Sequence, residues 1–288
     1  MEMRKVAVLG AGLMGHGIAQ VAAQLAKYEV NLRDVKQEFL DNGMKMIRDS
    51  LKKFVDKGKI SEEEMSETLD RIHLTIDLKE AVADADLIIE AVPENVGIKK
   101  SVFVEVEKFA GRNAIIVSNT SSISITLIAS ATRRPEKFCG MHFFNPPQLM
   151  TLVEVVRGAK TSDDTVDAVV EAAKKMGKEP VVVKKDSPGF IVNRILIPAL
   201  NEALYLVWEG VADRDEIDKA VRLGLNWPMG PLTLLDSVGL DTALAILEIF
   251  QRELGDVKYR PCPLLTQMVR AGLLGRKTGK GFYDWEKK

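Results

Sequence analysis

The sequence predicts an α/β fold in which a doubly wound, mostly parallel sheet is followed by an all-α C-terminal domain. Three observations predict it. Strand-like and helix-like segments alternate over the first two-thirds of the chain, a glycine-rich turn follows the first strand, and the patterns after residue 186 are helical. We expect a first domain over residues 1–186 and a second over residues 187–288.

Length and composition fit this two-domain expectation. The chain has 288 residues, of which 46% are hydrophobic and 28% charged, enough for two separate cores. The formal net charge of −1 gives no global field for nucleic acid or for a membrane surface, so we expect neither as a partner. No stretch of 18 apolar residues occurs, and the first strand begins by Arg4, so we expect a cytoplasmic protein without a leader. Cys139 and Cys262 have no metal or disulfide spacing, and no metal is expected.

The first strand, near residues 4–9, leads directly into Gly10-Ala11-Gly12-Leu13-Met14-Gly15, and a helical pattern follows. Asp34 comes 19 residues after Gly15, at the end of the next apolar stretch. In this context the three glycines have separate tasks: a tight turn, close approach of the backbone to a pyrophosphate, and packing of the helix against the sheet. The pattern predicts a Rossmann-type dinucleotide site. The alternative is an ordinary strand-turn-helix with small residues chosen for packing.

Asp34 bears on the choice of dinucleotide. A carboxylate at this position accepts hydrogen bonds from the ribose hydroxyls and repels a 2′-phosphate, which favours NAD over NADP. The adjacent Arg33 works in the other direction, because an arginine can accommodate that phosphate.

The remaining elements of the first domain follow from apolar runs and turn residues. The chain between Asp34 and Ile72 is longer than one crossover helix needs, and it predicts a helical hairpin whose second helix opens at Ser61. A helix over 163–176 is ended by Gly177. Strands are expected near 4–9, 29–34, 72–76, 86–92, 114–118, 138–144, 152–156 and 180–183.

The second domain is expected to be helical throughout. Ser187 and Pro188 have the pattern of an N-cap and a first-turn proline for a helix that runs to Trp208, with a kink at Pro198. Two further helices are expected, from Asp213 to Gly224 and from Asp241 to Leu254.

Of the three histidines, His142 interrupts an apolar strand just before Asn145-Pro146-Pro147, whereas His16 belongs to the glycine loop and His73 has a structural pattern. Glu154 lies in a second strand with apolar neighbours on both sides, so its carboxylate is expected to be buried and to require a partner. His142 is the nearest plausible partner, and a carboxylate on one ring nitrogen leaves the other free to act as a base. Two alternatives remain open: a histidine satisfied within the core, and a glutamate paired with a lysine or a backbone amide.

A polar cluster over residues 118–122 follows the apolar run at 114–117, where a strand reaches the ligand-binding edge of such a sheet. An ordinary capping turn is the alternative. Asn193 lies on the first turn of the helix expected after Pro188. Its position fits a solvent-facing polar residue as well as a functional one.

Six motifs are distributed along the chain from near residue 4 to Trp285. They are Gly10-Ala11-Gly12-Leu13-Met14-Gly15, Glu90-Ala91-Val92-Pro93-Glu94-Asn95, Ser118-Asn119-Thr120-Ser121-Ser122, His142-Phe143-Phe144-Asn145-Pro146, Pro188-Gly189-Phe190-Ile191-Val192-Asn193-Arg194 and Gly230-Pro231-Leu232. Taken together, these motifs resemble the 3-hydroxyacyl-CoA dehydrogenase family, and the size of the chain resembles its single-chain 3-hydroxybutyryl-CoA dehydrogenases.

The resemblance implies a role for particular residues. It implies that His142 is the general base, that Glu154 orients it, and that Ser121 and Asn193 orient an acyl-CoA substrate. It also implies a homodimer formed through the helical domain. The positions that line the NAD cleft in the family are the glycine loop with Leu13 and Met14, then Asp34, Glu94, Lys99, Asn119, Asn145 and Lys277. Those that meet coenzyme A are Ser50 and Lys57.

Two other functions are compatible with a scaffold of this kind. One is a β-hydroxyacid dehydrogenase acting on a small free acid, an enzyme class that commonly uses a catalytic lysine. The other is a non-catalytic structural protein like the lens crystallin that resembles this family. The intact set of His142, Glu154, Ser121 and Asn193 argues against the second.

Overall fold

The computed structural model describes residues 3–285. Its chain forms two compact units, of which the first ends at Ser187 and the second begins at Pro188. Within the described residues, no helix is long and apolar enough to cross a membrane.

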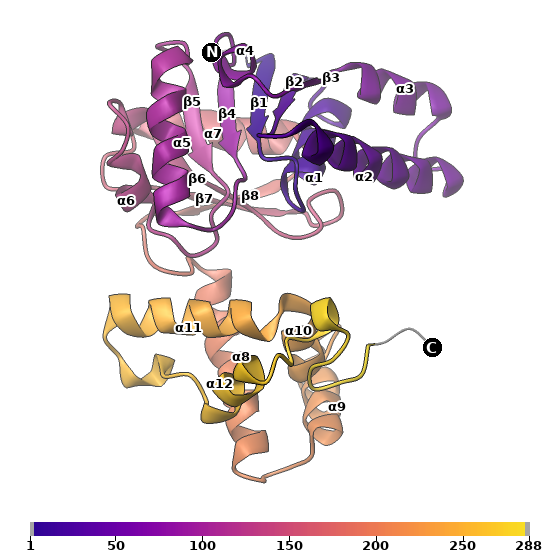
Figure 1. The fold of residues 1–288 in the computed structure, drawn as a ribbon, viewed down its shortest axis with the longest axis vertical. Coiled ribbons are helices and arrows are strands. Elements are labelled where there is room, and N and C mark those ends of the chain that lie inside the picture. The colour runs from indigo at the N-terminus through magenta and orange to yellow at the C-terminus, as the bar shows by residue number, and fades with distance from the viewer. Residues whose placement is uncertain (1–2, 286–288) are drawn as a thin grey trace. The chain divides into compact units, whose positions relative to one another are not determined.

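The described part of the first unit holds one eight-stranded sheet with the order β3-β2-β1-β4-β5-β6-β7-β8 (Figure 1). Every neighbouring pair is parallel except β6 and β7, which are antiparallel. The doubly wound, mostly parallel sheet expected from the sequence is confirmed, and each expected strand is present with ends that differ by at most two residues. The strands are β1 (Lys5–Leu9), β2 (Glu29–Arg33), β3 (Ile72–Thr75), β4 (Leu87–Glu90), β5 (Ile115–Ser118), β6 (Phe138–Phe143), β7 (Leu152–Val156) and β8 (Glu179–Val183).

Helices cover both faces of this sheet (Figure 1). The helical hairpin expected after Asp34 is confirmed as α2 and α3, and Ser61 and Glu64 form the capping box that begins its second helix. Gly177, with φ of +69°, follows the end of α7 as expected. The helices are α1 (Gly15–Gln24), α2 (Gln37–Asp56), α3 (Glu62–Asp70), α4 (Leu78–Val82), α5 (Val96–Phe109), α6 (Ile125–Ala129) and α7 (Asp163–Lys175), with a 3₁₀ turn η1 (Pro135–Lys137).

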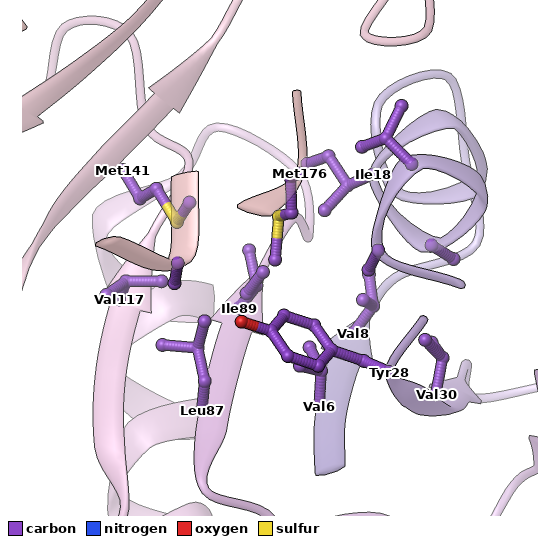
Figure 2. Close-up of a cluster of buried hydrophobic side chains, with 14 of the residues drawn as sticks. Val6, Val8, Ile18, Tyr28, Val30, Leu87, Ile89, Val117, Met141 and Met176 are labelled. Atoms are coloured by element: carbon purple, nitrogen blue, oxygen red, sulfur yellow. The ribbon is translucent and has the colours of Figure 1, made fainter. Parts of the chain in front are cut away.

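One face of the sheet packs against α1, α2 and α7 in a continuous apolar cluster. Figure 2 shows its centre, where Val6, Val8, Leu87 and Ile89 of the central strands face Ile18 of α1. Side chains alternate along a strand, so the residues between these point to the other face, which carries α4, α5 and α6. There Phe103 of α5 meets Phe138 of β6 edge to face at 4.8 Å. His142, an even number of residues from Phe138, lies on that same face.

The second unit is helical, as expected, and has its own core. Its first helix starts later than the sequence predicts: α8 begins at Val192, not at the turn after Ser187. Gly189 and Phe190 have φ of +76° and +50°, which no right-handed helix can contain, so the Ser-Pro pair introduces a turn instead. The helices are α8 (Val192–Trp208), α9 (Arg214–Gly224), α10 (Pro231–Val238), α11 (Leu240–Leu254) and α12 (Pro263–Arg270), with 3₁₀ turns η2 (Val257–Tyr259) and η3 (Arg276–Thr278).

Candidate active site

The glycine loop between β1 and α1 is shaped by close backbone contacts. Gly10 has φ of +104°, and a Cβ there would lie 2.6 Å from the carbonyl oxygen of Ala91. A Cβ on Gly15 would lie 1.7 Å from the carbonyl oxygen of Gly10, so the helix can begin this close to the strand only with glycine. Gly12 differs, because a Cβ there would meet no atom within 4 Å. The bare backbone at Gly12 therefore faces open space, which fits the approach of a pyrophosphate.

Asp34 follows β2 and is fixed at the rim of this loop. Its Oδ2 accepts a hydrogen bond from the backbone N–H of Ala11 at 2.7 Å, and its Oδ1 accepts one from Val35 at 2.6 Å. The Nε of Arg33 donates to the carbonyl oxygen of Ile76 at 3.3 Å, beyond the end of β3. The Asp34 carboxylate thus contacts the glycine loop, whereas the Arg33 guanidinium binds main chain near the edge of the sheet. The residues present fit an NAD ribose and pyrophosphate.

A buried ion-pair network lies next to this loop, at the ends of β4 and β5. Lys99 of α5 is 1% exposed, and its Nζ donates to Glu90 at 2.7 Å and lies 3.3 Å from an oxygen of Glu94. Ser118 donates to the second oxygen of Glu90 at 2.5 Å. Burial raises the pKa of Glu90 above its ordinary value, although Lys99 and the hydrogen bonds act against that rise. Burial also acts to raise the pKa of Glu94, but Lys99 and Thr120 outweigh it and the pKa is lowered.

Glu94 holds the polar segment after β5. One of its oxygens, Oε1, accepts from Thr120 Oγ1 at 2.6 Å and from the backbone N–H of Ser121 at 2.9 Å. Asn119, in the same segment, accepts through Oδ1 from the backbone N–H of Phe143 at 2.8 Å. Sequence positions 94, 99, 119 and 121 therefore come together in one hydrogen-bonded group that adjoins the strand of His142.

His142 and Glu154 are directly opposite each other on the antiparallel strands β6 and β7. Nδ1 of the histidine lies 2.7 Å from Oε2 of the glutamate, and the two side chains are 7% and 1% exposed. The pairing expected from the sequence is present. The ring of Phe144 packs on the imidazole, with 4.5 Å between ring centroids. A buried carboxylate on Nδ1 fixes the ring orientation and its tautomer.

The candidate residues for coenzyme A lie on the hairpin. Ser50 is on α2, and its Oγ accepts from Nε2 of Gln148 at 3.4 Å. Lys57 caps the C-terminus of α2 and is exposed. Asn145, which follows β6, is also exposed.

Two candidates belong to the second unit. Asn193 is the second residue of α8, and Lys277 lies in η3, where its ammonium pairs with Asp241 of α11. Asp236 anchors the segment after η3, because its carboxylate accepts from the backbone N–H of Phe282 at 2.9 Å and of Tyr283 at 2.8 Å.

Sequence reasoning did not find Glu90 and Asp241. Glu90 carried a usable signal, because it ends the apolar run Leu87–Ile89 and a carboxylate buried there needs a cation. Asp241 was read only as a helix start, whereas α11 begins at Leu240. Among the described residues, no group of His, Cys, Asp and Glu is arranged to hold a metal ion.

Both units match the models of a known protein family, and similar proteins are known. Residues 5–187 match the model of the 3-hydroxyacyl-CoA dehydrogenase NAD binding domain, and residues 189–285 match that of the family's C-terminal domain. A probable 3-hydroxybutyryl-CoA dehydrogenase of Deinococcus radiodurans is 53% identical over 98% of this chain and 100% of its own length. The 3-hydroxybutyryl-CoA dehydrogenase of Bradyrhizobium diazoefficiens is 49% identical over 98% of this chain and 96% of its own.

A solved structure agrees with these relatives. The crystal structure of an (S)-3-hydroxybutyryl-CoA dehydrogenase from Ralstonia eutropha matches with a TM-score of 0.96 and 44% identity, over 99% of this chain and 100% of that one. The resemblance predicted from the motifs is thereby confirmed, and residues 5–187 form an NAD-binding domain. The chain belongs to the 3-hydroxyacyl-CoA dehydrogenase family.

Proposed function

We propose that this chain interconverts a 3-hydroxyacyl-CoA and the corresponding 3-ketoacyl-CoA with NAD(H), and that its substrates are short, of the 3-hydroxybutyryl-CoA and acetoacetyl-CoA type. The observation that carries the proposal is the buried His142–Glu154 pair on the strands beside the NAD-binding half of the sheet. The printed names of relatives at 53% and 49% identity support the choice of substrate. The relative from Ralstonia eutropha supports the S configuration at C3.

His142 acts as the general base. Glu154 accepts the hydrogen bond from Nδ1, and we assign to Nε2 the transfer of the C3 hydroxyl proton, which it takes during oxidation and returns during reduction. The carboxylate also stabilises the imidazolium that forms when the proton has moved. NAD, when bound, supplies hydride acceptance from C3.

Placement of the reactants is the task of the other candidates. We assign Ser121 and Asn193 to orienting the acyl-CoA, and Ser50 and Lys57 to the coenzyme A moiety. The dinucleotide would be held by Gly10, Gly12, Leu13, Met14 and Gly15 at its pyrophosphate, with Asp34 at its ribose. The remaining residues that we assign to the dinucleotide site are Glu94, Lys99, Asn119, Asn145 and Lys277. The burial of Lys99 favours an indirect role, in which it fixes Glu94 rather than touching the dinucleotide.

The family resemblance further favours a homodimer formed through the helical domain. The cysteine usage favours work in the cytoplasm. Two buried free cysteines, Cys139 and Cys262, are compatible with a reducing compartment. Burial raises the pKa of the Cys139 thiol to about 12, which disfavours the reactive thiolate form.

One assay tests the proposed function. NADH oxidation is measured with acetoacetyl-CoA, with longer 3-ketoacyl-CoAs and with free acetoacetate, and each is repeated with NADPH. We expect the highest kcat/KM with acetoacetyl-CoA and NADH, because Asp34 would repel a 2′-phosphate. Comparable kcat/KM with free acetoacetate would refute the coenzyme A assignment in favour of a free-acid dehydrogenase, and comparable kcat/KM with NADPH would refute the cofactor preference.

A further inference from the structure

Lys178 is a buried lysine for which the reaction described above has no use. It lies in the turn between α7 and β8 and is 6% exposed. Its Nζ donates to the carbonyl oxygen of Pro147 at 2.5 Å and to that of Met150 at 2.9 Å. Burial lowers the pKa of Lys178, so the protein holds this ammonium at a cost in solvation. Both hydrogen-bond partners belong to one short segment of main chain.

That segment, residues 144–151, connects β6 with β7 and therefore connects His142 with Glu154. Within it, the carbonyl oxygen of Pro146 accepts from the backbone N–H of Leu149 and of Met150, each at 3.0 Å, and closes a compact turn. The geometry of the connection between two antiparallel strands helps to fix which residues of the strands stand opposite each other. Lys178 therefore binds the connection that helps to set the register between His142 and Glu154.

The other side of the same segment reaches two more parts of the candidate site. A Cβ on Gly17 of α1 would lie 2.6 Å from Oε1 of Gln148 and 2.9 Å from Cδ of Pro147, so the segment packs tightly on the helix behind the glycine loop. Gln148 also donates to Ser50 of α2. Residues 144–151 thus link the base, the dinucleotide-binding helix and the hairpin.

We propose that Lys178 is a positioning residue, whose ammonium holds residues 144–151 so that His142, Asn145 and Ser50 keep their places during turnover. The proposal rests on the proposed function, since it concerns how that site is held together. Without the ammonium, the carbonyl groups of Pro147 and Met150 lose this donor and the segment is free to shift. A displacement of about 1 Å at catalytic groups is enough to lower a rate by roughly 10²-fold. Most of the residues assigned to the dinucleotide, the glycine loop and Asp34 among them, lie outside this segment and keep their own contacts, so a shift of Asn145 should weaken NADH binding far less than it slows turnover.

The test compares Lys178→Met with wild type. Lys175→Met is the matched control, because Lys175 is an exposed lysine at the end of α7. The measurements are kcat and KM for acetoacetyl-CoA, and the Kd for NADH from its fluorescence. In Lys178→Met we expect kcat to fall about 10- to 100-fold and KM for acetoacetyl-CoA to rise, with the Kd for NADH changed less than about threefold. Lys175→Met should match wild type.

Lys178→Gln provides a second variant, because its amide keeps two N–H donors without the charge or the full length of lysine. We expect its kcat to lie between those of wild type and Lys178→Met. If Lys178→Met does not fold, the same measurements on Lys178→Gln test the proposal. A kcat within twofold of the Lys175→Met control would overturn the proposal. So would a fall in kcat that is matched by an equal loss of NADH affinity. Wild-type enzyme without acetoacetyl-CoA turnover would instead refute the proposed function, and the positioning role with it.

Discussion

Two histidine–glutamate contacts lie in different regions of the same sheet. At the edge, Nε2 of His73 on β3 lies 2.9 Å from Oε2 of Glu29 on β2, and the side chains are 56% and 49% exposed. On the strands β6 and β7, Nδ1 of His142 lies 2.7 Å from Oε2 of Glu154, with side chains 7% and 1% exposed. The residue types and the distances are nearly the same, so the contact itself does not identify a catalytic base.

Burial makes the difference between the two pairs. At the exposed edge, water and salt compete for both charges, and such pairs contribute little. In the interior neither group can exchange its partner for water, so the carboxylate holds the ring in one orientation and one tautomer. A histidine–glutamate pair from which solvent is excluded therefore has the fixed ring orientation and tautomer that proton transfer requires.

The largest effect expected from this comparison is on turnover. His142→Ala should lower kcat by about 10²- to 10⁴-fold, because that is the usual contribution of a positioned acid–base group, and NADH should still bind. His73→Ala, the matched control, should change kcat by less than about twofold, as is usual for a surface substitution. Steady-state assays with acetoacetyl-CoA and a fluorescence titration of NADH check both. Similar losses in the two variants would break the distinction.

The second prediction concerns whether each pair acts as a unit. Glu154→Gln should lower kcat by misorienting the imidazole, and the double variant His142→Ala/Glu154→Gln should be little worse than His142→Ala alone, since groups that act together are strongly non-additive. Glu29→Gln should leave kcat unchanged. If the two losses at 142 and 154 multiply, Glu154 does not act through His142.

The third prediction concerns stability. Glu154→Ala should lower the free energy of unfolding by about 1–3 kcal/mol, since it removes the acceptor of a buried hydrogen bond from the neutral imidazole. Glu29→Ala should lower it by only about 0.2–1 kcal/mol, because the edge pair is largely exposed. Urea denaturation followed by circular dichroism measures both values. Equal losses would mean that burial does not separate the two pairs.

The smallest expected effect is a difference between the two pairs in how salt changes their coupling free energy. A double-mutant cycle on the unfolding free energy of His73 and Glu29 should give a coupling of about 0.2–0.5 kcal/mol that decreases as sodium chloride is added. The coupling between His142 and Glu154 should not respond in this way, since ions do not reach it. A salt-sensitive coupling in the buried pair would show that solvent enters the site.

Much of the first unit could be predicted from the sequence, because its signals are local. The buried parallel strands are continuous apolar runs, and the glycine loop has fixed spacing to Asp34. The His142–Glu154 pairing could also be predicted, since a carboxylate between apolar neighbours requires a partner. The error at the start of α8 has a local cause too: the positive φ of the non-glycine residue Phe190 has no reliable sequence signal.

Other parts of the site depend on contacts that no local pattern records. Lys99 matches a cofactor-lining position, but its burial against Glu90 and Glu94 follows from the packing of α5 on β4 and β5. Lys178 has the sequence context of an ordinary turn between a helix and a strand, Gly177-Lys178-Glu179-Pro180. Its carbonyl partners are 31 and 28 residues away, so only the folded chain identifies them.

The antiparallel register of β6 and β7 makes the chain between them intolerant of changes in length. Because Met141 pairs with Val155 and Phe143 with Val153, a slip of one residue would place a valine opposite His142 and turn Glu154 to the other face. Insertions and deletions between residues 144 and 151 should therefore abolish activity even where the protein still folds. The exposed turn around Gly255, where a Cβ would meet no atom within 4 Å, should accept them. Within this family, the length of the first connection should vary far less than that of the second.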